Sequence, residues 1–156
     1  MADNAFLGTG MKFPPQIDKA TGRFVTVSGN QTVKESIYLI LMTQKTERLA
    51  RPDFGSEIMS YTFMDTGVTM LSIMRRSLTQ TILAQEPRIS DVDVTTEFHD
   101  REGMILINIA YTVAATNTRD NLVFPFYLNS GELPEETVEE DFIMPDEGPG
   151  TPYMDE

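Results

Sequence analysis

The chain has 156 residues, 40% of them hydrophobic, which predicts a single domain with one core. It has no cysteine and one histidine, His99, so disulfides and thiolate metal sites are excluded and a histidine-based zinc site is not expected. No run reaches the roughly 18 consecutive apolar residues of a membrane span, and the first residues lack the basic-then-apolar order of a secretory signal. We therefore expect a protein made and used on the cytoplasmic side, with no membrane partner and no cofactor.

The net charge of −12 is unevenly distributed. Residues 130–156 hold ten acidic residues and no Lys or Arg, whereas residues 1–129 hold fourteen acidic and twelve basic residues. Because nucleic-acid binding requires clustered Lys and Arg, no nucleic-acid partner is expected. Residues 130–156 also contain four prolines, so we expect an acidic tail that is disordered or folds only on a partner. The tail is either a solvating extension or a docking segment anchored by its apolar residues Phe142, Ile143, Met144 and Tyr153.

Residues 1–22 are interrupted by glycine and proline, which predicts an extended segment that lies over a surface with its aromatic residues docked. The main domain is expected over residues 23–129. It opens with "RFVTVSG", residues 23–29, whose alternation is typical of a short strand.

Two helices follow in the predicted order. The first spans residues 33–44, with Asn30 or Thr32 as its cap, and it is apolar on most of its circumference. The second runs from Asp65 or Thr66 to Gln85, and Pro87 ends it because the residue before a proline is displaced from the α region. Four residues of this helix share a spacing that predicts a core-facing side: Leu71, Met74, Leu78 and Ile82.

Three strands are predicted next, at residues 90–98, 104–115 and 121–128. A hairpin over residues 99–103 joins the first two, with Gly103 available for a positive φ. Pro125 cannot donate a ladder hydrogen bond, so the third strand is expected at a sheet edge or bulged. The predicted fold class is α+β, with two main helices packed on a small antiparallel sheet and a disordered acidic C-terminal tail.

No sequence signature of a catalytic or nucleotide site occurs in the chain. His99 lies in the predicted hairpin turn, where a solvated side chain is the ordinary outcome. Glycoside hydrolysis needs only two carboxylates, one of them with a raised pKa, but the outward strand positions of Asp91 and Asp93 need no chemistry to explain them. We therefore predict no catalytic residue and no bound metal.

The loop "ERLARPDFGSEI" has an unusual density of conformationally specific residues. Pro52 fixes φ, Asp53 is able to close a turn on backbone N–H groups, and Gly55 allows conformations that other residues avoid. The structural interpretation is a rigid connector whose Phe54 plugs the core and whose Arg51 is a surface charge.

The stretch "AQEPRISDVDV" leads from the second helix into the first sheet strand. Pro87 stops the helix, Arg88 complements the negative end of the helix dipole, and Glu86 is placed to pair with a nearby arginine. A charge pair beside a rigid turn also suits partner recognition. The residues alone leave these two interpretations open.

The stretches "TVKESIYLILMTQKTERLARPDFGSEIMSYTF", "AQEPRISDVDV", "INIAYTV" and "NLVFPFYL", taken in order, resemble the lysozyme-like, gpW-like wedge family of contractile-tail baseplates. That family includes phage proteins and the equivalent subunits of type VI secretion systems and extracellular contractile injection systems. The resemblance covers roughly residues 6–128 and does not extend to the acidic tail.

The resemblance implies a structural subunit of the inner baseplate, present in multiple copies around the tube and located in the baseplate of the virion or injection particle after assembly in the bacterial cytoplasm. Its implied partners are other baseplate wedge proteins, the sheath subunit and the spike or hub and tube-initiator proteins. The family implies that the sheath builds on its sheet edges by β-augmentation. Partner contacts are expected at Glu86, Pro87 and Arg88, and at Arg51, Asp53 and Phe54.

Two alternatives stay open. One is a peptidoglycan-cleaving muramidase of the tail, prompted by the family's lysozyme-like label and by the supply of carboxylates. The other is a small adaptor whose acidic tail binds a basic partner.

Overall fold

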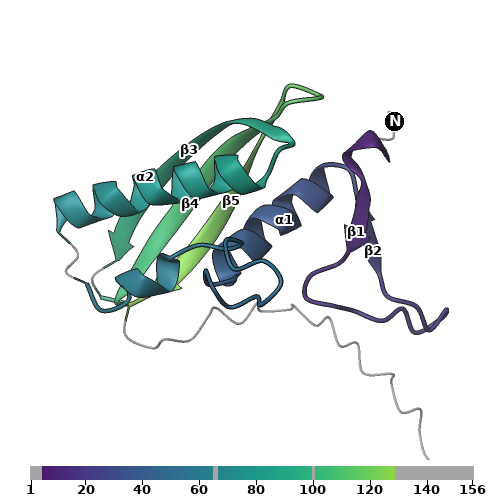
Figure 1. Ribbon diagram of the computed structural model, residues 1–156, viewed down its shortest axis with the longest axis horizontal. Coiled ribbons are helices and arrows are strands. Elements are labelled where there is room, and N and C mark those ends of the chain that lie inside the picture. The colour runs from purple at the N-terminus through teal and green to yellow at the C-terminus, as the bar shows by residue number, and fades with distance from the viewer. Residues whose placement is uncertain (1–4, 65–66, 100, 129–156) are drawn as a thin grey trace, which may run out of the picture.

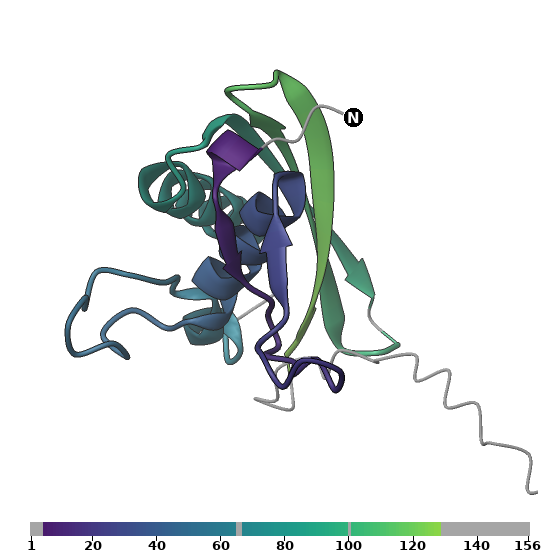
Figure 2. The same cartoon turned by 90° about the vertical axis from the view of Figure 1, so that its right-hand side faces the viewer.

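The computed structural model describes residues 5–64, 67–99 and 101–128. The predicted acidic tail, residues 130–156, lies outside the described residues, and its predicted disorder stays a prediction. Two helices, α1 (Asn30–Met42) and α2 (Val68–Gln85), pack on one face of a three-stranded antiparallel sheet (Figures 1 and 2). The predicted α+β class is confirmed.

The sheet has the strand order β3 (Ile89–His99), β4 (Met104–Val113) and β5 (Thr118–Tyr127). All three strands alternate between buried and accessible positions, as a sheet covered on one face requires. The hairpin between β3 and β4 places Gly103 at φ 59°, as predicted. Pro125 lies on β5, an edge strand of this sheet, and pairs with Leu106 without a bulge. The edge position expected from proline is confirmed.

The core lies between the helices and the sheet. On β4, Ile107 and Ile109 are fully buried, and on α1 every residue except Gln31 is at least half-buried. The predicted burial of the first helix is therefore confirmed. Both helices and all three strands contribute buried apolar side chains, among them Val33, Ile37, Leu41, Met74, Leu78, Ile82, Val92, Val94, Ile105, Phe124 and Phe126.

The helix boundaries differ from the prediction at three of four ends. α1 begins at Asn30, directly after Gly29, which has φ 65°. Thr32 therefore lies inside the first turn, and its hydroxyl donates to the carbonyl of Val27 (3.0 Å) instead of capping the helix. It ends at Met42, because the carbonyl of Thr43 accepts a hydrogen bond from Ser56 (2.8 Å) instead of continuing the helix.

α2 begins at Val68 with Gly67 as its cap residue, whereas Asp65 and Thr66 lie outside the described residues. Its end at Gln85 matches the prediction. β5 begins at Thr118, earlier than predicted, because Asn117 at φ 50° makes a tighter turn than expected.

The N-terminal segment carries structure that the sequence did not predict. It forms a short helical turn, η1 (Ala5–Leu7), and a strand, β1 (Thr9–Met11), that pairs with β2 (Thr26–Ser28). This β1–β2 pair lies beside α1 (Figure 2). It crosses the predicted boundary at residue 22, and that division of the chain into domains stays a prediction.

The N-terminal segment docks by one aromatic residue of the two expected. The ring of Phe13 lies 5.8 Å from that of Tyr38, which lies 5.7 Å from that of Phe124 on β5. The backbone N–H of Phe13 donates to the buried carboxylate of Glu35 (3.0 Å). Phe6, by contrast, is exposed. Docking therefore combines one aromatic contact with a buried polar contact to α1.

Candidate partner-binding site

Residues 85–88 form the turn between α2 and β3, and Glu86 is the C-cap residue of the helix. Its backbone N–H donates to the carbonyl of Ile82 (2.9 Å), which makes the last helical bond. Pro87 follows and stops the helix, as predicted. The Glu86 side chain turns inward and is only 1% exposed.

The Glu86 carboxylate is held by the arginine two residues further on. Arg88 donates to it from Nε (2.6 Å), from Nη2 (2.6 Å) and from its backbone N–H (3.2 Å). Two guanidinium donors on the two oxygens of one carboxylate make a bidentate pair with a fixed orientation. The expected arginine partner of Glu86 is thus Arg88 itself.

The pair shifts both pKa values towards the charged forms. Burial raises the pKa of the Glu86 carboxyl, but hydrogen bonds from Arg88 and Ser36 outweigh burial, so this pKa is below its usual range. The hydrogen bond to Glu86 raises the pKa of Arg88. A general acid of a glycosidase needs a raised carboxyl pKa, so Glu86 is in the opposite electrostatic state to the one that a muramidase would require.

Arg88 also binds the N-terminal segment. Its Nη1 donates to the carbonyl of Leu7 (2.9 Å), and the side chain of Leu7 is itself buried in the core. The Glu86–Arg88 pair therefore fixes the position of a segment about eighty residues away in the sequence.

This geometry changes how the predicted contacts at residues 86–88 would work. Glu86 is buried, so in the isolated chain it does not face a partner. Pro87 is exposed and the Arg88 side chain is 27% exposed, so these two residues lie at the surface. Partner contact at this turn stays a prediction, with Glu86 as the residue that orients Arg88.

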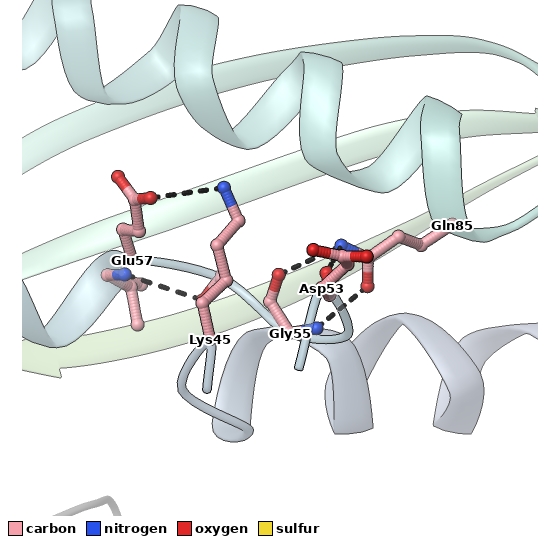
Figure 3. Close-up of polar contacts among 7 residues, drawn as sticks. Lys45, Asp53, Gly55, Glu57 and Gln85 are labelled. Atoms are coloured by element: carbon pink, nitrogen blue, oxygen red, sulfur yellow. Dashed lines mark hydrogen bonds and ion pairs between the residues drawn. The ribbon is translucent and has the colours of Figure 1, made fainter. Parts of the chain in front are cut away.

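Gln85, the last residue of α2, is a site residue that sequence reasoning missed. Its Oε1 accepts a hydrogen bond from the N–H of Gly55 (2.8 Å), and its Nε2 donates to the carbonyls of Gly55 (2.9 Å) and Asp53 (3.1 Å) (Figure 3). A single amide group thus replaces the turn-closing role that was expected of the exposed Asp53 side chain. In the sequence, the only indication of this role of Gln85 is its position beside Glu86.

The loop between α1 and η2 (Ile58–Tyr61) passes very close to the end of α1. Gly55 has φ 109°, and a Cβ at this position would lie 2.2 Å from the carbonyl oxygen of Thr43, so only glycine fits. Lys45 forms an ion pair with Glu57 across the base of the loop (3.1 Å; Figure 3). The loop is therefore fixed at its base by the close approach of Gly55 to Thr43 and by the Lys45–Glu57 ion pair.

The prediction that Phe54 plugs the core is wrong. Phe54 is half-buried and lies outside the core cluster. The guanidinium carbons of Arg48 and Arg51 lie 4.4 and 5.8 Å from its ring centroid. Guanidinium groups stack well on aromatic faces, so the ring is covered by two cations of its own loop.

The loop and the second half of α2 enclose an open groove of about 870 Å³. Lys45 and residues 50–54 form one wall, and α2 with Pro87 forms the other. The predicted contacts Arg51, Asp53, Phe54 and Pro87 all line this groove, whereas Glu86 and Arg88 lie behind Pro87. Two motifs that are about thirty residues apart in sequence therefore form one surface, which we call the loop–helix groove.

Among the described residues, no cluster of three or more His, Asp or Glu side chains is arranged to hold a metal ion. No helix within the described ranges is long and apolar enough to cross a membrane. His99 is exposed at the end of β3, and Asp91 and Asp93 point outward from the same strand.

The fold and the groove define a small α+β protein. The residues of its two sequence motifs hold the loop and the N-terminal segment in place beside a surface groove. The chain belongs to the family of the baseplate wedge protein gp25, whose model matches residues 27–118 and so includes both motifs. No curated protein matches the chain.

Several solved structures are similar to the chain, among them the following three. A Geobacter sulfurreducens protein with the provisional name tail lysozyme is 40% identical, with a TM-score of 0.62 over 68% of this chain and 96% of that one. A chain of the anti-feeding prophage baseplate is 21% identical, with a TM-score of 0.55 over 81% and 90%. A chain of the type VI secretion system baseplate complex is 21% identical, with a TM-score of 0.53 over 64% and 93%. At 21% identity, the last two similarities show a shared fold and nothing more.

Proposed function

We propose that this chain is a structural wedge subunit of the baseplate of a contractile tail or injection system. It joins the inner ring of the baseplate to the first sheath ring, in several copies around the tube. Its partners are other wedge proteins, the sheath subunit and the spike or hub and tube-initiator proteins. The observation that carries this proposal is the family match over residues 27–118, which includes the complete loop–helix groove.

In this proposal the loop–helix groove is where neighbouring wedge proteins dock. Arg51 and Pro87 are exposed in its lining, which also includes Phe54 with its ring stacked by Arg48 and Arg51. Arginine and aromatic residues contribute most of the binding energy at many interfaces. Because Gln85 on the helix wall bonds residues 53 and 55 of the loop wall, the groove has little conformational freedom to lose on binding.

The test is a charge reversal at the rim, Arg51→Glu, with Arg23→Glu as the matched control on an exposed turn of the N-terminal segment. We expect Arg51→Glu to leave thermal unfolding of the purified chain unchanged and to prevent baseplate assembly in cells that produce the particle. The control should assemble normally. Normal particles from Arg51→Glu would contradict a docking role for the groove.

The sheath contact is proposed to use strand addition at a free sheet edge. Leu128 donates its N–H to the carbonyl of Gly103 (2.9 Å), so the even-numbered residues of β5 bond β4. In an antiparallel ladder the intervening residues point their N–H and C=O groups away from the partner strand. Residues such as Val123 therefore offer these groups to an added strand, and Pro125 interrupts the row at one donor. By the same register, Thr96 is outward-facing on the β3 edge.

Proline substitution tests each edge without removing a bond of the sheet itself. Val123→Pro removes one outward donor of β5, and Thr96→Pro removes one outward donor of β3. We expect the variant on the edge that the sheath uses to give baseplates without a sheath. The variant on the other edge should give sheathed particles. If both variants give normal sheathed particles, strand addition is not the contact.

A further inference from the structure

The outer face of the three-stranded sheet carries a group of apolar side chains. Both helices pack on the other face of the sheet (Figure 2), so alternate residues of β3, β4 and β5 point outward on this one. The register brings five apolar residues together at one end of the outer face: Met104, Leu106, Val123, Pro125 and Tyr127. They form one continuous surface two strands wide, which we call the outer-face patch.

Strand formation alone does not account for this patch. Valine and tyrosine are common in strands, but proline is depleted there, and Pro125 lies directly beside Leu106. Val123 and Tyr127 are 46% and 38% exposed. The open face of an antiparallel sheet is ordinarily polar, and contiguous apolar residues on such a face are typical of an interaction site.

An acidic column runs along β3 beside the patch. Asp91, Asp93 and Glu97 all point outward and are exposed, and none of them forms an ion pair with another residue that the structure describes. Glu97 lies directly opposite Leu106 on β4. The acidic column and the outer-face patch therefore form one surface.

The outer face stays negative when all its described charges are counted. Arg119 is the one Lys or Arg at an outward strand position, so three carboxylates and one guanidinium give a net charge of −2. Arg119 lies in the row of Thr112 and Asp91, at the opposite end of the sheet from the patch and about 10 Å from the acidic column. In the turn between β3 and β4, Arg101 and Glu102 cancel.

The dimensions of this surface fit an α-helix. The column from Asp91 to Glu97 is about 20 Å long, which a helix of about 14 residues spans. The patch is two strands wide, or about one helix diameter. A sheet is commonly covered by helices, as the inner face of this one already is.

Charge decides which occupant fits. A second copy of the chain has the same negative charge on this face. Residues 130–156 of the chain hold ten acidic residues and no Lys or Arg, so the column would repel them as well. A partner with Lys or Arg beside its apolar residues is complementary to both parts of the surface.

We propose that the outer face of the sheet binds a basic amphipathic helix of a partner protein. The apolar stripe of that helix packs on the outer-face patch, and a row of Lys or Arg along its flank faces Asp91, Asp93 and Glu97. This face is separate from the loop–helix groove and from the backbone groups of the sheet edges, so the helix contact is independent of the proposed function.

The first test uses the full chain and a synthetic helical peptide of about 18 residues, with leucines on one face and lysines along one flank. We expect it to shift the NMR amide signals of Leu106 and Val123 and to leave those of the groove residues Gln80 and Ala84 in place. A peptide of the same composition in scrambled order should not bind. Equal binding of the two peptides, shifts confined to the groove, or no binding would overturn the proposal.

A charge reversal tests the acidic column. Asp93→Lys should weaken binding of the peptide about threefold to tenfold. Asp53→Lys, at an exposed position of the loop, makes the same change in net charge and should alter binding by less than about twofold at physiological salt. Equal effects of the two variants would show that the acidic column is not the contact.

A pair of apolar substitutions tests the patch. Leu106→Thr with Val123→Thr keeps residues that suit a strand and should weaken binding at least about tenfold. Val68→Thr with Ile73→Thr changes two exposed apolar residues of α2 and should have no effect on binding. Thermal unfolding checks that each variant is folded, and Asp93→Lys still tests the surface if the patch variant is not.

The second test is a photo-cross-linking residue, p-benzoylphenylalanine, in place of Asn108, which lies on the outer face beside Val123. In the purified chain, a cross-link to residues 129–156 or to a second copy would identify a different occupant and overturn the proposal. In cells that produce the chain, mass spectrometry should find a cross-linked peptide with Lys or Arg beside apolar residues at helical spacing. An acidic peptide, or no cross-linked partner, would contradict the basic helix.

Discussion

Glu86 and Arg88 show how a charged motif becomes part of the protein's internal structure. The carboxylate is buried and accepts three hydrogen bonds from Arg88, while Arg88 also holds the carbonyl of Leu7. Removing one member of such a pair leaves a buried charged group without its partner, which is more costly than the pair is stabilising. If Arg88 also contacts a partner, as proposed, a variant of Glu86 alone does not separate an effect on folding from an effect on docking.

The pH dependence of stability should report this pair. Because the pKa of Glu86 in the folded chain is below the ordinary value of 4.5, its contribution is present above pH 4.5 and is lost as the pH falls through the folded-state pKa. We expect Glu86→Gln to lower the free energy of unfolding by about 1.5–3 kcal/mol at pH 7. In urea unfolding, this difference from the unmodified chain should shrink below pH 4.5. A difference that stays constant from pH 7 to pH 3 would contradict the ionised pair.

Gly55 is a second position where one residue determines local structure. Gly55→Ala places a Cβ against the Thr43 carbonyl in a conformation closed to alanine, so we expect a loss of at least about 1–3 kcal/mol in thermal unfolding. Gly10→Ala is the control, since its Cβ would lie 3.5 Å from Thr32, an ordinary contact, and it should change stability by less than about 0.5 kcal/mol. Equal effects of the two substitutions would contradict the close approach.

At the scale of elements, Gln85 joins the end of α2 to the loop over residues 53–55. Gln85→Glu keeps the acceptor for the Gly55 N–H but replaces the amide nitrogen, which donates to two carbonyls, with an oxygen that cannot donate to them. We expect faster amide hydrogen exchange at Gly55 and in the loop, since the opening free energy of this unit falls. Ser72→Glu, at an exposed position of the same helix outside the groove lining, is the control and should leave loop exchange unchanged. If Gln85→Glu also leaves it unchanged, the amide does not hold the loop.

The elements also show what the sequence was able to predict. The end of α2 followed from Pro87, and the three sheet strands followed from alternation, because both signals are local. The strand predicted at residues 23–29 contains β2, but its partner β1 was missed because three residues that include a glycine are too few for a pattern. The role of Gln85 was missed because nothing local connects an amide to a loop thirty residues away. Phe54 was placed in the core because an aromatic residue is apolar, but stacking by Arg48 and Arg51 covers it at the surface.

At the scale of the whole molecule, three segments meet around residues 85–88. The N-terminal segment binds Arg88, the loop binds Gln85 at the end of α2, and the sheet begins at Ile89. A partner bound in the loop–helix groove would thus contact the turn over residues 85–88, which leads directly into the first strand of the sheet. The sheet in turn has its free edges at β3 and β5 within the described residues. This arrangement suits a subunit that connects one ring of an assembly to the next.

The most direct test of the wedge role is a cryo-EM structure of the particle purified from cells that produce this chain. We expect several copies of this domain around the tube, with Arg51, Phe54 and Pro87 buried against a neighbouring wedge protein and a strand of the sheath subunit paired with β3 or β5. A baseplate that lacks the chain, or that contains it with the groove and both sheet edges in solvent, would contradict the wedge role.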